Sequence, residues 1–207
     1  QAVSKLFELG CPLVILACNT ASAKALRTIQ QINLPVIDAT RRVLGVIRPT
    51  AECIGEITRS RHVGILATAG TIKSESYLLE IHKLSPDIVV TGEACPMWVS
   101  LVENNEYQSE GADYFVKQHI NRLLDKDPMI DTIILGCTHY PLLLDKIRQF
   151  TPGHIRIIAQ GEYVARSLQD YLNRHPEMDA RCEKGGKCRF LTTESENKFE
   201  ESASIFL

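Results

Sequence analysis

The sequence has no long hydrophobic run and no excess of charge of either sign. Its 207 residues carry a formal net charge of −2, and no apolar stretch approaches the roughly 20 residues that a membrane-spanning helix needs. A nearly balanced charge gives no electrostatic reason to bind nucleic acid or a membrane surface. We therefore expect neither nucleic acid nor a membrane among the partners of this protein.

Several cofactor and targeting patterns are also missing. The sequence has no glycine-rich phosphate loop, no lysine in a recognisable pyridoxal phosphate context and no signal peptide pattern at its start. These absences predict a cytoplasmic protein that works without a cofactor and without a metal. The chain begins at Gln1 inside a predicted helix and ends in another, so we expect it to be part of a longer protein.

The seven cysteines are an odd number, and several lie in apolar runs. This usage is typical of free thiols in a reducing compartment, not of a disulfide framework. Cys182 and Cys188 form the one local pair. A zinc site there would need two more ligands, with only His175 nearby, so a turn at Gly185 and Gly186 with two incidental cysteines is the favoured interpretation.

Short apolar runs alternate with amphipathic segments along the whole chain. Continuous apolar runs are typical of strands buried on both faces, and spacings of three and four residues are typical of helices. The predicted strands are 12–17, 35–38, 62–67, 87–91, 131–136, 154–158 and 189–193. The predicted helices are 2–9, 21–32, 42–47, 51–57, 72–84, 111–124, 142–150, 162–173 and 196–207. This alternation predicts an α/β fold of βα repeats with mostly parallel sheets.

Two segments resemble each other, and each centres on a cysteine. They read LVILACNT at 13–20 and TIILGCTH at 132–139. Each places its cysteine, Cys18 or Cys137, where a strand passes into a helix, which is where parallel sheets bind ligands. The free N–H groups and the dipole of a helix start favour a thiolate and also a substrate carboxylate. One thiol on each side of a substrate would suit removing a proton from one face of a carbon and returning one to the other.

Polar side chains follow both cysteines. Asn19 and Thr20 follow the first, Thr138 and His139 follow the second, and His139 would hold or deliver the proton of that thiol. A buried cysteine is often only a small hydrophobic residue, and we assign that role to Cys11, Cys53 and Cys95, which lack such neighbours. The other histidines are assigned to the surface or to strand edges: His62, His82, His119, His154 and His175.

The two cysteine motifs, extended to ACNTASA at 17–23 and GCTHYPLL at 136–143, resemble those of bacterial glutamate racemases. ATAGT at 67–71 and ACPMWVSLVE at 94–103 are similar to the same family, so the resemblance runs along the whole chain. It implies cofactor-independent racemisation of glutamate, supplying D-glutamate for peptidoglycan. It also implies two pseudo-symmetric α/β domains, 1–42 with 158–207 and 43–157, an active site in the cleft between them, and a homodimer.

The resemblance also implies roles for single residues. Cys18 would be the base that acts on D-glutamate, and Cys137 the base that acts on L-glutamate, assisted by Glu103 and His139. The substrate-binding residues would be Asn19, Thr20, Thr68, Thr71 and Thr138. For Glu103 the alternative is a solvated loop carboxylate, and for Thr68 and Thr71 it is helix capping.

The sequence departs from the family in two respects. The Asp-Ser-Gly motif that supplies the partner of the first cysteine does not precede Cys18, and Ala159 stands where many relatives carry Asp. The chain is therefore expected to lack one wall of the site. Three alternatives stay open: a racemase of aspartate or a hydantoin, against which His139 argues; a non-catalytic protein that binds DNA gyrase; and a folded but inactive structural fragment.

Overall fold

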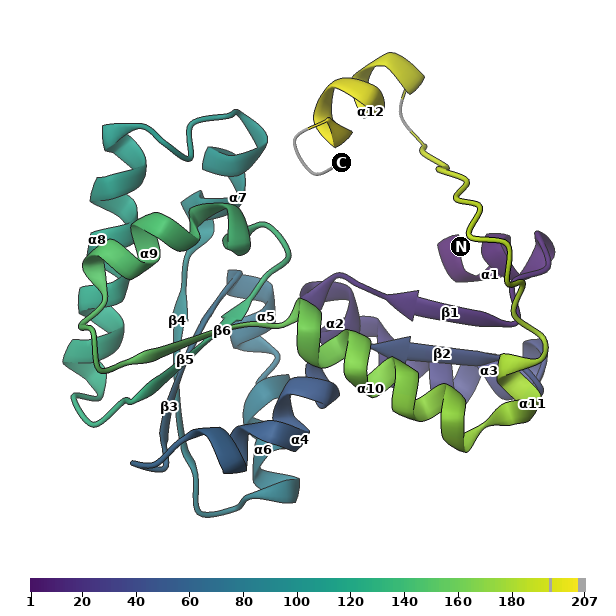
Figure 1. Cartoon of the computed structure of the whole chain (residues 1–207), viewed down its shortest axis with the longest axis horizontal. Helices are drawn as coiled ribbons and strands as arrows, with labels where there is room; N and C mark the ends of the chain where they lie inside the picture. Colours follow the sequence, from purple (N-terminus) through teal and green to yellow (C-terminus); the bar gives the residue numbers. More distant parts are fainter. Residues whose placement is uncertain (194, 205–207) are drawn as a thin grey trace.

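The computed structural model describes residues 1–193 and 195–204, and their α/β fold is built on parallel sheets (Figure 1). The strands are β1 Leu13–Leu16, β2 Arg42–Gly45, β3 His62–Ala67, β4 Val89–Ala94, β5 Thr132–Gly136 and β6 Arg156–Ala159. The helices are α1 Ala2–Glu8, α2 Asn19–Thr28, η1 Ile29–Asn33, α3 Leu34–Ile37, α4 Ile47–Ile57, α5 Ala69–Lys73, α6 Ser76–Leu84, α7 Pro96–Glu103, α8 Glu110–Lys126, η2 Tyr140–Leu143, α9 Leu144–Phe150, α10 Gly161–Arg174, α11 Pro176–Asp179 and α12 Glu196–Ala203.

The strands form two separate sheets. One has the order β4-β3-β5-β6 and the other pairs β1 with β2, and every pairing is parallel. In the larger sheet Ala67 at the end of β3 pairs with Gly136 at the end of β5. All carboxyl ends of a parallel sheet lie at one edge, so the residues that follow β3 and β5 are neighbours. The predicted α/β class with parallel sheets is confirmed.

The larger sheet is buried on both faces, and its strands send alternate side chains to two cores. Leu66, Ile133 and Leu135 join the core under α7, α8 and α9, whereas Ile65 and Ile134 join the core under α4 and α6. Figure 1 shows these two groups of helices on opposite sides of the sheet. This two-sided burial explains why the strands read as continuous apolar runs instead of alternating ones.

The smaller sheet has a thinner core. Its buried hydrophobic cluster consists of Phe7, Val14, Leu34 and Val43, on the face that carries α1 and α2. On the other face Ile15 keeps 37% of its surface exposed. The chain passes between the sheets twice, from β2 through α4 to β3 and from β6 into α10. The predicted domain boundaries at 42/43 and 157/158 fall inside β2 and β6, and the division stays a prediction.

Three predicted elements are wrong. Residues 35–38 form helix α3 instead of a strand, since Pro35 lies in its first turn, where a missing N–H costs little. Residues 42–47 begin with strand β2 instead of a helix, because 42–45 pair with β1 and tertiary pairing overrides local propensity. Residues 189–193 are not a strand, and they have no strand partner among the residues that the structure describes. The last predicted helix, 196–207, is found as α12, and its final residues lie outside the described part.

None of the helices within the described ranges has the length and apolar character needed to cross a membrane.

Candidate active site

Cys18 and Cys137 occupy matching places in the two sheets. Cys18 follows β1 and is the N-cap of α2, with extended backbone (φ −77°, ψ 125°), and its carbonyl oxygen accepts the N–H of Ser22 at 2.9 Å. Cys137 follows β5, and its carbonyl oxygen accepts the N–H of Tyr140 as the chain turns into η2. Each cysteine therefore stands at the carboxyl end of a parallel strand and at the start of a helical turn.

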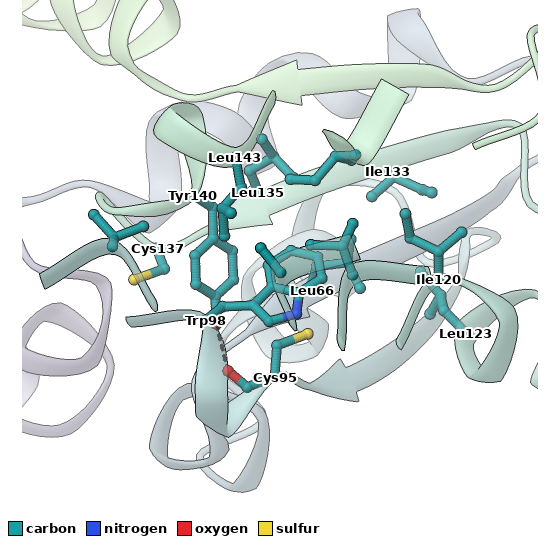
Figure 2. Close-up of a cluster of buried hydrophobic side chains, with 14 of the residues drawn as sticks. Leu66, Cys95, Trp98, Ile120, Leu123, Ile133, Leu135, Cys137, Tyr140 and Leu143 are labelled. Atoms are coloured by element: carbon teal, nitrogen blue, oxygen red, sulfur yellow. Dashed lines mark hydrogen bonds between the residues drawn. The ribbon is translucent and has the colours of Figure 1, made fainter. Parts of the chain in front are cut away.

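The surroundings of the two thiols differ. Cys18 is exposed, whereas Cys137 is buried, with 8% of its surface accessible. Figure 2 shows Cys137 at one margin of the core, next to Tyr140 and Trp98. Burial raises the pKa of the Cys137 thiol, the backbone N–H groups of His139 and Thr138 oppose this rise, and the negative charges of Cys18 and Glu103 add to it. The two motifs are joined through a third strand end. Thr20, two residues after Cys18, lies within hydrogen-bond distance (2.8 Å) of Thr68, which follows β3, and β3 pairs with β5, the strand before Cys137.

His139 joins Cys137 to a carboxylate. Its Nδ1 lies 3.7 Å from the Cys137 Sγ, and its Nε2 lies 3.2 Å from Oε1 of Glu103, at the end of α7. Glu103 is 60% exposed in its side chain but is not a free loop carboxylate, since it contacts the imidazole. A ring between a thiol and a carboxylate can take up or release a proton while both nitrogens keep a partner.

Three threonine hydroxyls meet near the starts of α2 and α5. The Oγ1 of Thr20 lies 2.8 Å from that of Thr68 and 3.1 Å from that of Thr71, and the latter two are 3.1 Å apart. Thr68 also caps α5, because its oxygen accepts the N–H of Thr71 at 3.3 Å. Thr68 therefore has the predicted capping role and also lies beside Thr20 of the first cysteine motif.

Asn19 and Thr138, the two remaining predicted binding residues, lie directly after the cysteines. Asn19 is 3% exposed, and its Oδ1 accepts a hydrogen bond of 2.7 Å from the Tyr77 hydroxyl. Thr138 is exposed beside Cys137. Tyr77 was not singled out from the sequence, because a tyrosine among the apolar positions of a helix looks like an ordinary core residue and its partner is far away along the chain.

Other predicted assignments concern residues away from this site. Cys95 is fully buried in the core, as expected for a structural cysteine, with its carbonyl oxygen bonded to the Tyr140 hydroxyl (Figure 2). The prediction that His119 lies at the surface is wrong. Its side chain is buried, with 3% of the residue exposed, and its Nδ1 lies 2.8 Å from Oε1 of Glu93. Helical spacing in α8 put this ring inside, and a buried acid from β4 satisfies it.

No group of histidine, cysteine, aspartate and glutamate suited to a metal occurs in residues 1–193 and 195–204. A groove of about 780 Å³ runs between α2, α4, α6 and α10, and neither Cys18 nor Cys137 lines it. The cysteine site is therefore separate from this groove.

The fold and the site define a two-lobed α/β protein in which two thiols stand at matching strand ends, and these ends are connected through Thr20 and Thr68. The sequence matches the model of one protein family, Asp/Glu/hydantoin racemase, over residues 1–168. The chain belongs to this family, and the resemblance seen in its motifs is confirmed.

Its relatives include a glutamate racemase of Roseobacter denitrificans, 37% identical over 217 residues, which covers all of this chain and 77% of the relative. Among solved structures, a glutamate racemase isoform of Bacillus anthracis matches with a TM-score of 0.87 at 33% identity, over 99% of this chain and 73% of that one. A Francisella tularensis glutamate racemase in complex with D-glutamate matches with a TM-score of 0.83 at 28% identity. The match covers 98% of this chain and 72% of that one.

Proposed function

We propose that the protein interconverts L- and D-glutamate without a cofactor, with Cys18 and Cys137 as the two bases. The observation that supports this most directly is geometric: the hydroxyl of Thr20, two residues after Cys18, lies 2.8 Å from that of Thr68 directly after β3, and β3 pairs with β5, which leads into Cys137. Its relatives are named glutamate racemases, and one solved relative was crystallised with D-glutamate. The resulting D-glutamate would serve peptidoglycan synthesis; the cytoplasmic location and the homodimer also remain predictions.

The proposed reaction transfers one proton at each face of the α-carbon. From D-glutamate, the Cys18 thiolate takes the α-proton: the C–H bond breaks, an S–H bond forms, and the electron pair stays on the substrate, delocalised into its carboxylate. The Cys137 thiol then gives its proton to the opposite face, which yields L-glutamate and a Cys137 thiolate. The reverse reaction exchanges the two roles. The two thiols must start in opposite protonation states.

The environments of the cysteines support this division. Burial favours the protonated form of Cys137, which therefore suits the acid in the direction from D- to L-glutamate. His139 and Glu103 would hold the proton when Cys137 acts as the base. Uncharged donors from Asn19 and the cluster of Thr20, Thr68 and Thr71, with Thr138, would hold the substrate carboxylate and amino groups, and would stabilise the charge that grows in the transition state.

The test is exchange of the α-hydrogen of glutamate in deuterium oxide, followed by NMR, together with the optical activity of the product. We expect deuterium to enter both enantiomers with the parent chain. Exchange into aspartate or a hydantoin but not into glutamate would assign a different substrate of the same family. Absence of exchange into any of these acids would favour a non-catalytic role.

A further inference from the structure

Tyr77 of α6 contacts both cysteine motifs. Its hydroxyl donates to Oδ1 of Asn19, the residue after Cys18, at 2.7 Å. Its ring lies against Gly136, the residue before Cys137: a Cβ at Gly136 would be 3.2 Å from Cε2 of the ring. Tyr77 itself is 4% exposed. One rigid side chain therefore bridges the two segments that carry the thiols.

The hydroxyl also decides which way the Asn19 carboxamide faces. A side-chain amide has an acceptor oxygen at one end and two N–H donors at the other. Since the oxygen accepts from Tyr77, the Nδ2 group is turned to the opposite side. Asn19 is 3% exposed, so its carboxamide has little freedom to reorient through solvent.

Tyr77 is held as a donor by its surroundings. Burial raises the pKa of its hydroxyl far above the usual range, and the nearby Gln160 side chain lowers it by less, so the hydroxyl keeps its proton. Gln160 itself is anchored, since its Nε2 donates to the Val46 carbonyl at 3.1 Å and to Oγ1 of Thr50 at 3.0 Å. Both Val46 and Gln160 lie where the chain crosses between the two sheets.

We propose that Tyr77 is a positioning residue that holds the Asn19 carboxamide with its N–H donors toward the substrate carboxylate. The proposal rests on the proposed function, in which Asn19 binds that carboxylate. A flipped amide would present an oxygen to the carboxylate oxygens and repel them, so the fixed orientation selects an anionic group at this subsite. The ring of Tyr77 would at the same time hold the strand end before Cys137 in place.

The test removes only the hydroxyl. Tyr77→Phe keeps the ring against Gly136, and we expect it to raise KM for glutamate about tenfold, the loss of roughly one hydrogen bond. The kcat should fall as well, but by less than KM rises, because the Asn19 donors hold the carboxylate in the ground state and contact it more strongly as its charge grows in the transition state. In an Asn19→Ala background the same substitution should add nothing, since the amide is gone.

Two further variants sharpen the result, one read by its KM and one by an NMR signal that does not depend on turnover. Asn19→Asp keeps an acceptor for Tyr77 but puts an oxygen in place of the NH2 group, so it should raise KM at least as much as Tyr77→Phe. Tyr140→Phe is the matched control: it removes another buried hydroxyl, the one bonded to the Cys95 carbonyl at 3.1 Å, and should leave the side-chain amide signal of Asn19 in a ¹⁵N NMR spectrum unchanged.

Tyr77→Phe should shift that amide signal even in a chain that turns nothing over. An unchanged Asn19 signal would overturn the positioning role whether or not the protein is a racemase. An unchanged KM in an active Tyr77→Phe variant, or an equal rise in KM without the Asn19 amide, would overturn it as well. Lack of turnover by the parent would instead count against the proposed function.

Discussion

The two cysteine motifs share a sequence pattern but not an environment. Cys137 follows β5, whose five residues are all buried between β3 and β6, and the thiol itself is buried. Cys18 follows β1, whose one partner strand within the described residues is β2, and the thiol is exposed. The local pattern therefore sets where each sulfur stands on the backbone, whereas the packing around it sets which protonation state is favoured.

This difference suits a reaction that needs unlike thiols. Two identical sites would hold their protons equally, and neither would be preferred as the base. Burial raises the pKa of Cys137, and the negative charge of Cys18 raises it further, so Cys137 is harder to deprotonate when Cys18 is a thiolate. The predictions below test this difference and the packing that surrounds the two motifs, beginning with the largest expected effect.

Removing either sulfur should largely abolish racemisation but leave exchange of the α-hydrogen of one enantiomer. Loss of a positioned proton-transfer group typically costs about 10² to 10⁴ in rate, and we expect Cys18→Ala and Cys137→Ala to lose racemisation by about that much. Each variant should still exchange the α-hydrogen of one enantiomer: L-glutamate for Cys18→Ala and D-glutamate for Cys137→Ala. Deuterium incorporation measured separately from each enantiomer checks this asymmetry. Racemisation at the parental rate by either variant would end the two-thiol mechanism.

The sequence was sufficient to place these cysteines, and the reason is local. A continuous apolar run followed by Cys and a capping residue predicts a strand end at a helix start, and both motifs have that form in the structure. Helix α8 and strands β3 and β5 were predicted for the same reason, since burial imposes a clear periodicity on each. The relation of Cys18 to Cys137 was inferred from the likeness of the two motifs and from the family resemblance, because the number of residues between two positions does not give their distance in space.

What sequence patterns could not provide were contacts between distant elements. Residues 42–45 read as helical until β1 is known to pair with them, and His119 read as exposed until Glu93 is placed beside it. Tyr77 is the same case, since its hydroxyl is satisfied by a residue 58 positions away. Such partners are set by tertiary packing, which overrides local propensity.

The hydrogen bonds that hold the start of β5 should contribute to the stability of the larger sheet and not to that of the smaller one. Asp131, just before β5, accepts hydrogen bonds from the hydroxyls of Thr58 and Thr132 and from the N–H groups of Arg59 and Ser60, between 2.7 and 2.8 Å. Replacement by Asn removes the negative charge that strengthens these hydrogen bonds, and charge-assisted bonds are worth about 1.5 to 3 kcal/mol. It also leaves some of the donors without an acceptor. We expect Asp131→Asn to lower the free energy of unfolding by about 2 to 3 kcal/mol in denaturant titrations.

The same carboxylate predicts a pH dependence with a definite sign. Burial alone would raise the pKa of Asp131, but the hydrogen bonds outweigh it and hold the pKa well below its usual range. The stabilisation is therefore present above the unfolded-state pKa of about 3.9 and is lost as the pH falls below it. The parent should be more stable than Asp131→Asn at neutral pH, and this difference in the free energy of unfolding should disappear in acid. The control is Asp125→Asn, at an exposed position, over which the parent should have no such advantage at any pH. A constant difference across this range would contradict the assignment.

Exchanging the small residues before the two cysteines should show how differently the motifs are packed. A Cβ at Gly136 would lie 3.1 Å from the Cβ of Ala67 and 3.3 Å from the carbonyl oxygen of Leu66, and neither atom can move aside unless strand β3 moves. Overpacking of this kind costs about 1 to 3 kcal/mol, and we expect Gly136→Ala to destabilise by about 1 kcal/mol or more. The reciprocal change, Ala17→Gly at an exposed position, should cost less than about 1 kcal/mol. Thermal unfolding of both variants would decide, and equal costs would mean that the motifs are packed alike.

The smallest effect concerns the charges that act on Cys137. Only the thiolate is alkylated rapidly, so the pH midpoint of iodoacetamide labelling at Cys137, followed by peptide mass spectrometry, reports its pKa. Burial is the main cause of the raised pKa, and the charges of Cys18 and then Glu103 add to it. Cys18→Ala and Glu103→Gln should each lower the midpoint, by less than about one pH unit for the exposed carboxylate. Glu106→Gln, in the exposed loop after α7, serves as the control and should leave it unchanged. A midpoint that responds to Glu103 but not to Cys18 would show that the two sulfurs do not face one another, and the unlike pair would then be two unrelated thiols.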